Sequence, residues 1–245
     1  MQTAFVTGAD RGLGLSIVKL FAQKGWRVFA GSYLSDWLEL GELVHTFPGQ
    51  VTIVELDIAS DQSVKHSVEH VGSLVDCVDV IVNNAGVSTH LKDSNIQGKQ
   101  DYTDLLRLYN VNALGMLRVT KAYLPLTASS NLKRLCFVSS EAGSISACEW
   151  EAWYGYCMSK ASMNMGVNLL FHTLRPQGYT FRLFHPGWMK SYMSGVRNEQ
   201  AQLEPDVVAA SAISYFIQPR CAVQNGVTDE DRLVMRDWRG REWPW

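Results

Sequence analysis

The chain has 245 residues, of which 47% are hydrophobic and 19% are charged, and its formal net charge is −2 at pH 7. This balance predicts a folded globular protein, and the length suits one large α/β domain. The near-neutral charge argues against a nucleic-acid-binding surface, and no run of 18 apolar residues predicts a membrane span. The first residues include no basic, signal-like segment, so we expect a cytoplasmic protein. Five cysteines without short paired spacing suggest reduced thiols and no zinc site.

Six short apolar runs, rich in β-branched and aromatic residues, predict strands buried on both faces. They lie at 3–7, 27–31, 51–56, 78–84, 134–140 and 180–186. Segments with helical spacing separate them; in the first, Leu13, Ile17 and Phe21 lie on one helix face. Because neighbouring parallel strands need crossover connections, the alternation predicts a single α/β domain over 1–245, with a doubly wound parallel sheet and helices on both faces. Ligands in such sheets bind at the carboxyl ends of the strands.

The first predicted strand leads into the turn "TGADRGLG" at 7–14, and an amphipathic helix follows. Gly8, Gly12 and Gly14 allow the backbone to approach a ligand, and the free N–H groups of the first helical turn favour an anion. The strand before the turn and the helix after it favour a phosphate-binding turn over a tight corner without a ligand.

Further short motifs lie where later strands end or helices begin. They are "NNAG" at 83–86, "VNALG" at 111–115, "SSEAG" at 139–143, "YCMSK" at 156–160 and "HPGWMKS" at 185–191. Together with the opening turn they resemble, in the same order and over nearly the whole chain, the motifs of the short-chain dehydrogenase/reductase superfamily. The tail "RDWRGREWPW" looks like that of the carbonyl-reductase branch that includes the C-factor signalling proteins. The alternative is a tryptophan-rich tail packed over the sheet or against another subunit.

The resemblance implies a Rossmann fold that binds a nicotinamide cofactor. The predicted second strand ends at Ser32 and Tyr33 without an acid, and we expect Asp36 inside the following helix, so no carboxylate repels a 2′-phosphate. Arg11 matches the basic residue of family members that prefer NADP. We therefore expect NADP to be preferred without exclusion of NAD; the alternative is a surface arginine paired with Asp10.

The resemblance also assigns other cofactor contacts along the chain. Asp57 and Ile58 would contact the adenine ring. The asparagines of the NNAG motif, Asn84 among them, would fasten neighbouring strands, while Ala85 and Gly86 leave room for the adenosine ribose. Pro186 and Gly187 would let the backbone bend towards the nicotinamide, and the backbone around Met189 would bind the carboxamide. Together with Gly8, Arg11, Gly12, Leu13, Gly14, Tyr156 and Lys160, these residues form the expected cofactor site. Asp57 could instead be an ordinary helix cap.

Tyr156 and Lys160 are four residues apart, so a helix places their side chains on one face. A tyrosine pKa near 10 is too high for ready proton exchange at neutral pH, and a neighbouring ammonium favours the phenolate. We expect Tyr156 to act as general acid or base and Lys160 to lower its pKa; by resemblance, Lys160 would also bind the nicotinamide ribose. Tyr154 is followed four residues later by Met158, so it has no such lysine.

Two further catalytic residues come from the resemblance, each with a neighbouring rival. Ser140 is preferred to Ser139 because Gly143 then matches the family's S-x-x-G pattern, and its hydroxyl would stabilise the substrate oxygen. Asn112 is preferred to Asn110 and would hold a water that connects the lysine to solvent. A turn cap and an ordinary helix asparagine are the respective alternatives.

These features predict an NADP(H)-dependent oxidoreductase that acts on a small or medium carbonyl or alcohol substrate, under a mobile lid over about 188–205. We expect a homodimer or homotetramer, formed through helices near 101–128 and 156–175 by resemblance. One alternative is a non-catalytic, cofactor-binding sensor or signalling protein, because a fold does not fix a function. A nucleotide-sugar epimerase or dehydratase of the same superfamily is less favoured, because its glycine spacing usually differs.

Overall fold

An eight-stranded sheet forms the centre of the computed structural model, which describes residues 1–89, 91, 94–193, 195–219, 223–224, 227–228 and 230–245. Its strand order is β10-β9-β6-β5-β4-β1-β2-β3. All six predicted strands are present and parallel: β1 (Thr3–Val6), β2 (Arg27–Ser32), β3 (Val51–Glu55), β4 (Val80–Asn83), β5 (Arg134–Val138) and β6 (Thr180–His185). A separate hairpin pairs β7 (Val223–Gln224) with β8 (Val227–Thr228).

The C-terminal tail adds two strands that the sequence did not predict. β9 (Met235–Asp237) runs parallel to β6, and β10 (Glu242–Trp243) pairs with β9 in the antiparallel sense. Both are short and contain charged residues, so they lack the apolar run that identified the other strands. The tail therefore extends the sheet beyond β6.

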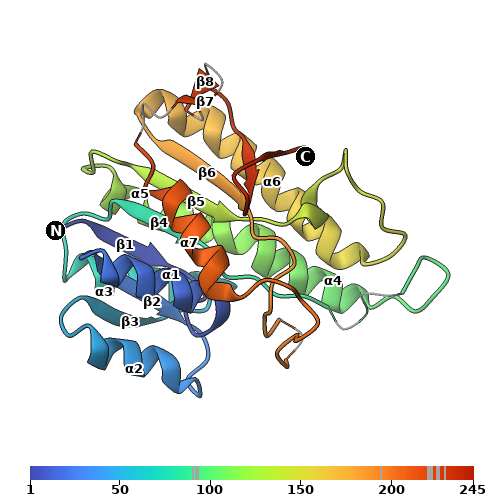
Figure 1. Cartoon of the computed structure of the whole chain (residues 1–245), viewed down its shortest axis with the longest axis horizontal. Coiled ribbons are helices and arrows are strands. Elements are labelled where there is room, and N and C mark those ends of the chain that lie inside the picture. The colour runs from blue at the N-terminus through green and yellow to red at the C-terminus, as the bar shows by residue number, and fades with distance from the viewer. Residues whose placement is uncertain (90, 92–93, 194, 220–222, 225–226, 229) are drawn as a thin grey trace.

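Helices cover both faces of the sheet, which confirms the doubly wound fold (Figure 1). One face packs against α1 (Gly12–Gln23), α2 (Leu38–Thr46) and α7 (Pro205–Phe216). The other packs against α3 (Asp61–Gly72), α5 (Met116–Thr127) and α6 (Tyr154–Leu174). The remaining helix is α4 (Tyr102–Tyr109), and 3₁₀ turns span Glu141–Gly143 and Arg175–Gln177. None of the helices in the described part of the chain is long and apolar enough to cross a membrane.

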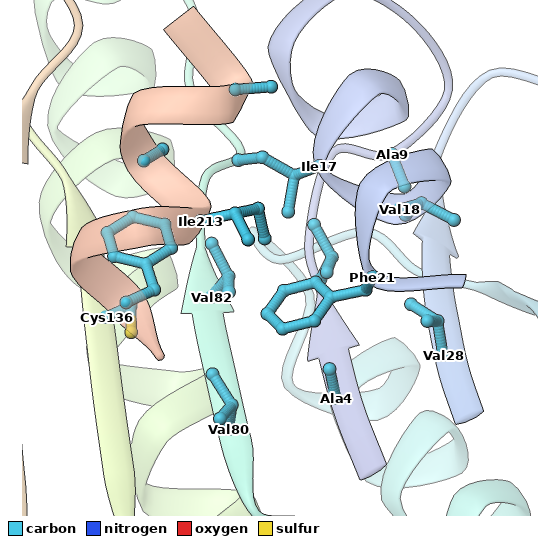
Figure 2. Packing of buried hydrophobic residues seen from close by; sticks show 14 of the residues in the cluster. Ala4, Ala9, Ile17, Val18, Phe21, Val28, Val80, Val82, Cys136 and Ile213 are labelled. Carbon is cyan, nitrogen blue, oxygen red and sulfur yellow. The ribbon is translucent and has the colours of Figure 1, made fainter. Parts of the chain in front are cut away.

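The core beneath α1 and α7 shows why the opening helix forms where it does (Figure 2). Ile17 and Phe21 of α1 face Ile213 of α7, above Ala4 of β1 and Val82 of β4. All five side chains are almost fully buried. Burial of this apolar face fixes α1 against the sheet, and with it the glycine turn at its N-terminus.

The segment near 101–128, where we expect helices, contains α4, a π-helical turn η1 (Asn110–Gly115), and α5. One local expectation differs from the structure. Asp36 lies in the turn before α2, which begins at Leu38, so its expected place inside the helix is wrong.

Candidate active site

Most of the predicted site residues lie at the carboxyl ends of β1, β4, β5 and β6. Asp57 and Ile58 follow β3, and Tyr156 and Lys160 lie on α6. The strand order changes direction between β1 and β4, since β1 continues to β2 and β3 on one side and β4 to β5 and β6 on the other. Loops leave such a point in opposite directions, and ligands bind in the crevice between them.

The turn after β1 has the shape of a phosphate cradle. Gly8 and Gly12 have φ angles of 63° and 57°, in the left-handed region that favours glycine. At Gly14 an added Cβ would collide with the Gly8 carbonyl oxygen and lie 2.6 Å from Asn84 Nδ2. No side chain caps the start of α1, so the first-turn N–H groups are directed at the turn. The residues present therefore fit the pyrophosphate of a dinucleotide.

Asn84 joins the opening turn to the end of β4. Its Nδ2 donates to the carbonyl oxygens of Thr7 at 2.9 Å and Gly8 at 3.0 Å. The Thr7 hydroxyl oxygen accepts from the N–H groups of Asn84 and Ala85, both at 3.0 Å. The two loops are thus one hydrogen-bonded unit, and Asn84 acts in it as a structural bridge.

At the end of β3, Asp57 and Ile58 make internal contacts. The Asp57 carboxylate accepts from the Ala59 N–H at 2.8 Å, and Ser60, not Asp57, caps α3. The Ile58 side chain is buried, and a Cβ added to Gly115 of η1 would lie 2.7 Å from its Cδ1. This packing positions the π-helical turn beside the end of β3.

Arg11 lies among aromatic rings and does not pair with Asp10. Its guanidinium carbon is 4.7 Å from the Trp37 ring centroid and 5.4 Å from that of Tyr192, and Nη2 donates to the Tyr192 carbonyl at 3.1 Å. Arg11, Trp37, Tyr192 and Gly12 are among the residues that line a surface pocket of about 460 Å³. The cation thus faces a space at the N-terminus of α1.

Tyr156, Ser140 and Lys160 meet between the end of β5 and the first turns of α6. The Ser140 side chain interacts with the Tyr156 phenol and favours a lower Tyr156 pKa. Lys160 Nζ lies 5.9 Å from the Tyr156 ring centroid and donates to the Val138 carbonyl at 3.0 Å. Tyr156 and Lys160 are both buried, at 7% and 3% exposure.

Burial controls the protonation of this pair. It raises the pKa of Tyr156 to about 12, against the lowering effect of the Ser140 side chain, and it lowers the pKa of Lys160 to about 8. The expected lowering of the Tyr156 pKa is therefore wrong for this structure, because removal of the phenol from water outweighs the nearby stabilising groups.

Asn112 completes the cluster from the π-helical turn. Its Oδ1 accepts from the Val87 N–H at 2.8 Å, and its Nδ2 donates to Ser159 Oγ at 2.9 Å. A Cβ added to Gly86 would lie 3.3 Å from Asn112 Oδ1 and 3.5 Å from Lys160 Nζ. Gly86, Asn112 and Lys160 are thus brought together from β4, η1 and α6.

The rival residues at these positions have other partners. Asn110 Oδ1 accepts from Arg118 Nη2 at 2.7 Å, on the side of α3 where Arg118 also pairs with Asp61. The Ser139 hydroxyl donates to Asn164 Oδ1 at 2.6 Å and is buried. The geometry therefore favours Asn112 and Ser140 as the residues that face Lys160 and Tyr156.

His185 links the loop after β5 to the loop after β6, although the sequence showed no partner for it. Its Nδ1 accepts from the N–H groups of Glu141 at 3.0 Å and Gly187 at 3.3 Å, which requires a neutral imidazole. Burial lowers the His185 pKa to about 4, which favours that form.

Beyond His185, Pro186 and Gly187 lead the chain out of the sheet to Met189, which pairs with Leu203 in an isolated β-bridge. A Cβ at Gly187 would lie 2.5 Å from Trp238 Cδ1, so the C-terminal tail packs directly on this loop.

Trp153 is a site residue that sequence reasoning missed. Its ring stacks on that of Tyr156, with centroids 4.5 Å apart and planes at 19°. Its φ of 66° is left-handed, and its buried Nε1 has no hydrogen-bond partner among the residues that the structure describes. A non-glycine residue in this conformation leaves no pattern in the sequence, so no signal identified it.

Two expectations about cysteines and metals bear on the chemistry. Cys77, Cys136, Cys148 and Cys157 are free thiols, and Cys221 lies outside the described residues. Within the described chain, no group of three or more His, Cys, Asp or Glu residues is arranged to hold a metal ion.

Comparisons with known proteins agree with the motif order. The family model of the short-chain dehydrogenases matches residues 2–202. The C-signal protein of Myxococcus xanthus is 38% identical over 168 residues, which cover 69% of this chain and 93% of that protein. An uncharacterised oxidoreductase of Schizosaccharomyces pombe is 30% identical over 243 residues, 95% of this chain and 91% of that protein.

Solved structures show the same fold at lower identity. An NADPH-bound carbonyl reductase from chicken fatty liver superposes with a TM-score of 0.84 at 24% identity, covering 100% of this chain and 99% of that one. The carbonyl reductase Sniffer of D. melanogaster gives a TM-score of 0.86 at 22% identity, covering 100% of both chains. The family model, the relatives and the arrangement of the strand ends together show that this chain belongs to the short-chain dehydrogenase family.

Proposed function

We propose that this chain is an NADP(H)-dependent oxidoreductase that interconverts a small or medium carbonyl compound and its alcohol. The observation that carries the proposal is the meeting of Tyr156, Ser140, Lys160 and Asn112 beside Gly86, next to a glycine turn suited to a dinucleotide. Tyr156 and Lys160 come from α6, Ser140 follows β5 and Asn112 lies in η1, so three separate segments of the chain supply these side chains.

Four side chains of the protein have different roles around the substrate oxygen. A bound nicotinamide cofactor supplies or accepts the hydride. Tyr156, with its pKa raised to about 12, holds its proton at neutral pH and donates it to the oxygen during reduction. Ser140 donates a hydrogen bond to the same oxygen and stabilises its developing charge. Lys160, whose Nζ lies 5.9 Å from the Tyr156 ring centroid, and Asn112 would provide the route by which Tyr156 is reprotonated.

Cofactor preference follows from the charge at the opening turn. Arg11 offers a guanidinium, and the end of β2 contributes no acid of its own. A charge-assisted hydrogen bond to a phosphate is worth roughly 1.5–3 kcal/mol, on the order of 10- to 100-fold in affinity. The NADPH-bound carbonyl reductase with the same fold supports NADP as the preferred cofactor, with NAD not excluded.

Other parts of the proposal concern the surroundings of the site. Asp57 and Ile58 would contact the adenine ring. Residues 188–205 would close over the substrate, and the β-bridge between Met189 and Leu203 would hold the two ends of this segment together. Large apolar side chains are exposed on α4 and α6, Leu106 at 70% and Leu169 at 61% among them, and would pair subunits in a cytoplasmic homo-oligomer.

The test is NADPH oxidation, followed by nicotinamide absorbance, over a panel of aldehydes, ketones and dicarbonyls. We expect Tyr156→Phe to reduce kcat on the order of 10²- to 10⁴-fold, while the cofactor still binds. Tyr154→Phe is the matched control, because this tyrosine lies two residues away on the same helix but is followed at i+4 by Met158. Equal turnover by the wild type and Tyr156→Phe would contradict the assignment of the acid.

A cofactor-binding protein without turnover is the alternative, favoured by the 38% identity to a protein named C-signal. NADPH binding by fluorescence titration, together with no turnover on any panel member, would support it.

A further inference from the structure

The end of β2 binds a buried carboxylate that belongs to the opening turn. Asp10 is only 5% exposed. Its Oδ1 accepts three hydrogen bonds, from the Ser32 hydroxyl at 2.5 Å and from the N–H groups of Tyr33 and Leu34, both at 2.8 Å. These donors are the last residue of β2 and the two that follow it. A negative charge is therefore fixed at this strand end, although β2 has no acid of its own.

This position matters because of where dinucleotides bind in the fold. The adenosine ribose lies at the end of the second strand, where a carboxylate suits the 2′-hydroxyl of NAD and a cation suits the 2′-phosphate of NADP. Asp10 brings a carboxylate to that end from the neighbouring turn. It also occupies three donors that a phosphate could otherwise use, so its effect on a phosphate is unfavourable in two ways.

The next residue in the chain carries the opposite charge. Arg11 does not neutralise Asp10, because its guanidinium lies against Trp37 and Tyr192 and donates to the Tyr192 carbonyl. Asp10 and Arg11 thus place charges of opposite sign beside the expected ribose position, and the two are held by separate sets of contacts. Other charged residues, Glu39, Arg197, Glu204 and Asp206, also line the pocket that Arg11 faces.

We propose that Asp10 is a cofactor-selectivity residue that weakens binding of the 2′-phosphorylated dinucleotide and so keeps NAD(H) competitive, in opposition to Arg11. This inference rests on the proposed function, because it concerns the same cofactor site. It predicts that the preference of this chain between NADPH and NADH depends on the opposing effects of two adjacent residues, Asp10 and Arg11.

The experiment compares dissociation constants of NADPH and NADH, measured by fluorescence titration of the wild type and of Asp10→Asn. Asparagine retains the Oδ1 acceptor and the shape of the side chain but removes the charge. We expect Asp10→Asn to tighten NADPH binding roughly three- to tenfold, with the NADH constant within about twofold of the wild type.

Two further variants separate local charge from other effects. Asp76→Asn removes the same charge from an exposed position before β4, near the amino-terminal ends of the parallel strands and so away from the expected cofactor site, and should leave the NADPH-to-NADH ratio unchanged. Arg11→Met should weaken NADPH binding alone. If Asp10→Asn does not fold by circular dichroism, Asp10→Ser also removes the charge.

The outcomes distinguish this inference from the proposed function. If Asp10→Asn leaves the ratio of the NADPH and NADH dissociation constants unchanged, or weakens the binding of both cofactors equally, then Asp10 only stabilises the loop. Either result would overturn this inference and leave the proposed function standing. If the wild type binds neither NADPH nor NADH, the proposed function fails and the inference with it.

Discussion

Replacement of Lys160 by methionine should change how the stability of the protein depends on pH. Burial lowers the Lys160 pKa from 10.5 to about 8. In the unfolded chain the lysine keeps its proton up to its ordinary pKa, so between pH 8 and 10.5 the unfolded state binds more protons than the native state. Stability of the wild type relative to Lys160→Met therefore rises with pH across this window.

The magnitude follows from the size of the pKa shift. Each unit corresponds to about 1.4 kcal/mol, so the fall to about 8 amounts to about 3 kcal/mol for the fully charged lysine. Loss of the hydrogen bond to the Val138 carbonyl acts in the opposite direction, by about 1–3 kcal/mol, at every pH. At pH 7 these two contributions oppose each other and are of similar size, so the effect of the substitution on the unfolding free energy at that pH can be small. The change of this effect with pH reports the buried ammonium alone.

Urea unfolding at pH 7, 8, 9 and 10 measures this change. We expect the difference in unfolding free energy, wild type minus Lys160→Met, to rise by about 2 kcal/mol between pH 8 and 10, the part of the full effect that falls in this range. Lys121→Met, at an exposed position of α5, is the control and should give a difference that does not vary with pH. A pH-independent difference for Lys160→Met as well would refute the reasoning.

Further predictions concern other residues of the site. Burial lowers the His185 pKa to about 4, so the contribution of His185 to stability is present above pH 6.5 and is lost as the pH falls towards 4. In His185→Gln, the unfolding free energy should therefore fall less between pH 6.5 and 4 than in the wild type. Because burial raises the Tyr156 pKa to about 12, the rate of alcohol oxidation should increase about tenfold per pH unit from pH 7 to 10, while the rate of carbonyl reduction stays level. A bell-shaped pH profile of oxidation centred near pH 7 would contradict this. Trp153→Ala should shift the oxidation profile to lower pH, because it exposes the phenol face to water, whereas Trp150→Ala should not. Gly86→Val should weaken cofactor binding in a titration, because its side chain would press on Asn112 and Lys160; an unchanged dissociation constant would count against this.

The sequence predicted the strands and glycine turn because their signals are local. Apolar runs identify buried strands, and the spacing of Gly8, Gly12 and Gly14 identifies the turn. The pairing of Tyr156 with Lys160 was likewise accessible, since four residues on a helix place two side chains on one face.

Contacts between distant segments could not be predicted in the same way. Asp10 accepts from residues more than 20 positions later, and His185 holds a loop 44 positions earlier. The rise of the Tyr156 pKa also depends on burial, which the fold produces and the spacing does not reveal. The left-handed Trp153 and the strands of the tail lack any local pattern.

The π-helical turn at Asn110–Gly115 has a consequence for how this protein can change over evolution. A π-turn accommodates one residue more than the regular helix, so deletion of a single residue such as Val111 would restore standard backbone pairing between α4 and α5. The same deletion would rotate the flanking residues by about 100° relative to each other and turn the Asn112 amide away from Lys160. Deletion of one codon would thus give a more regular and more stable helix, but one in which Asn112, the proposed catalytic asparagine, is no longer in place.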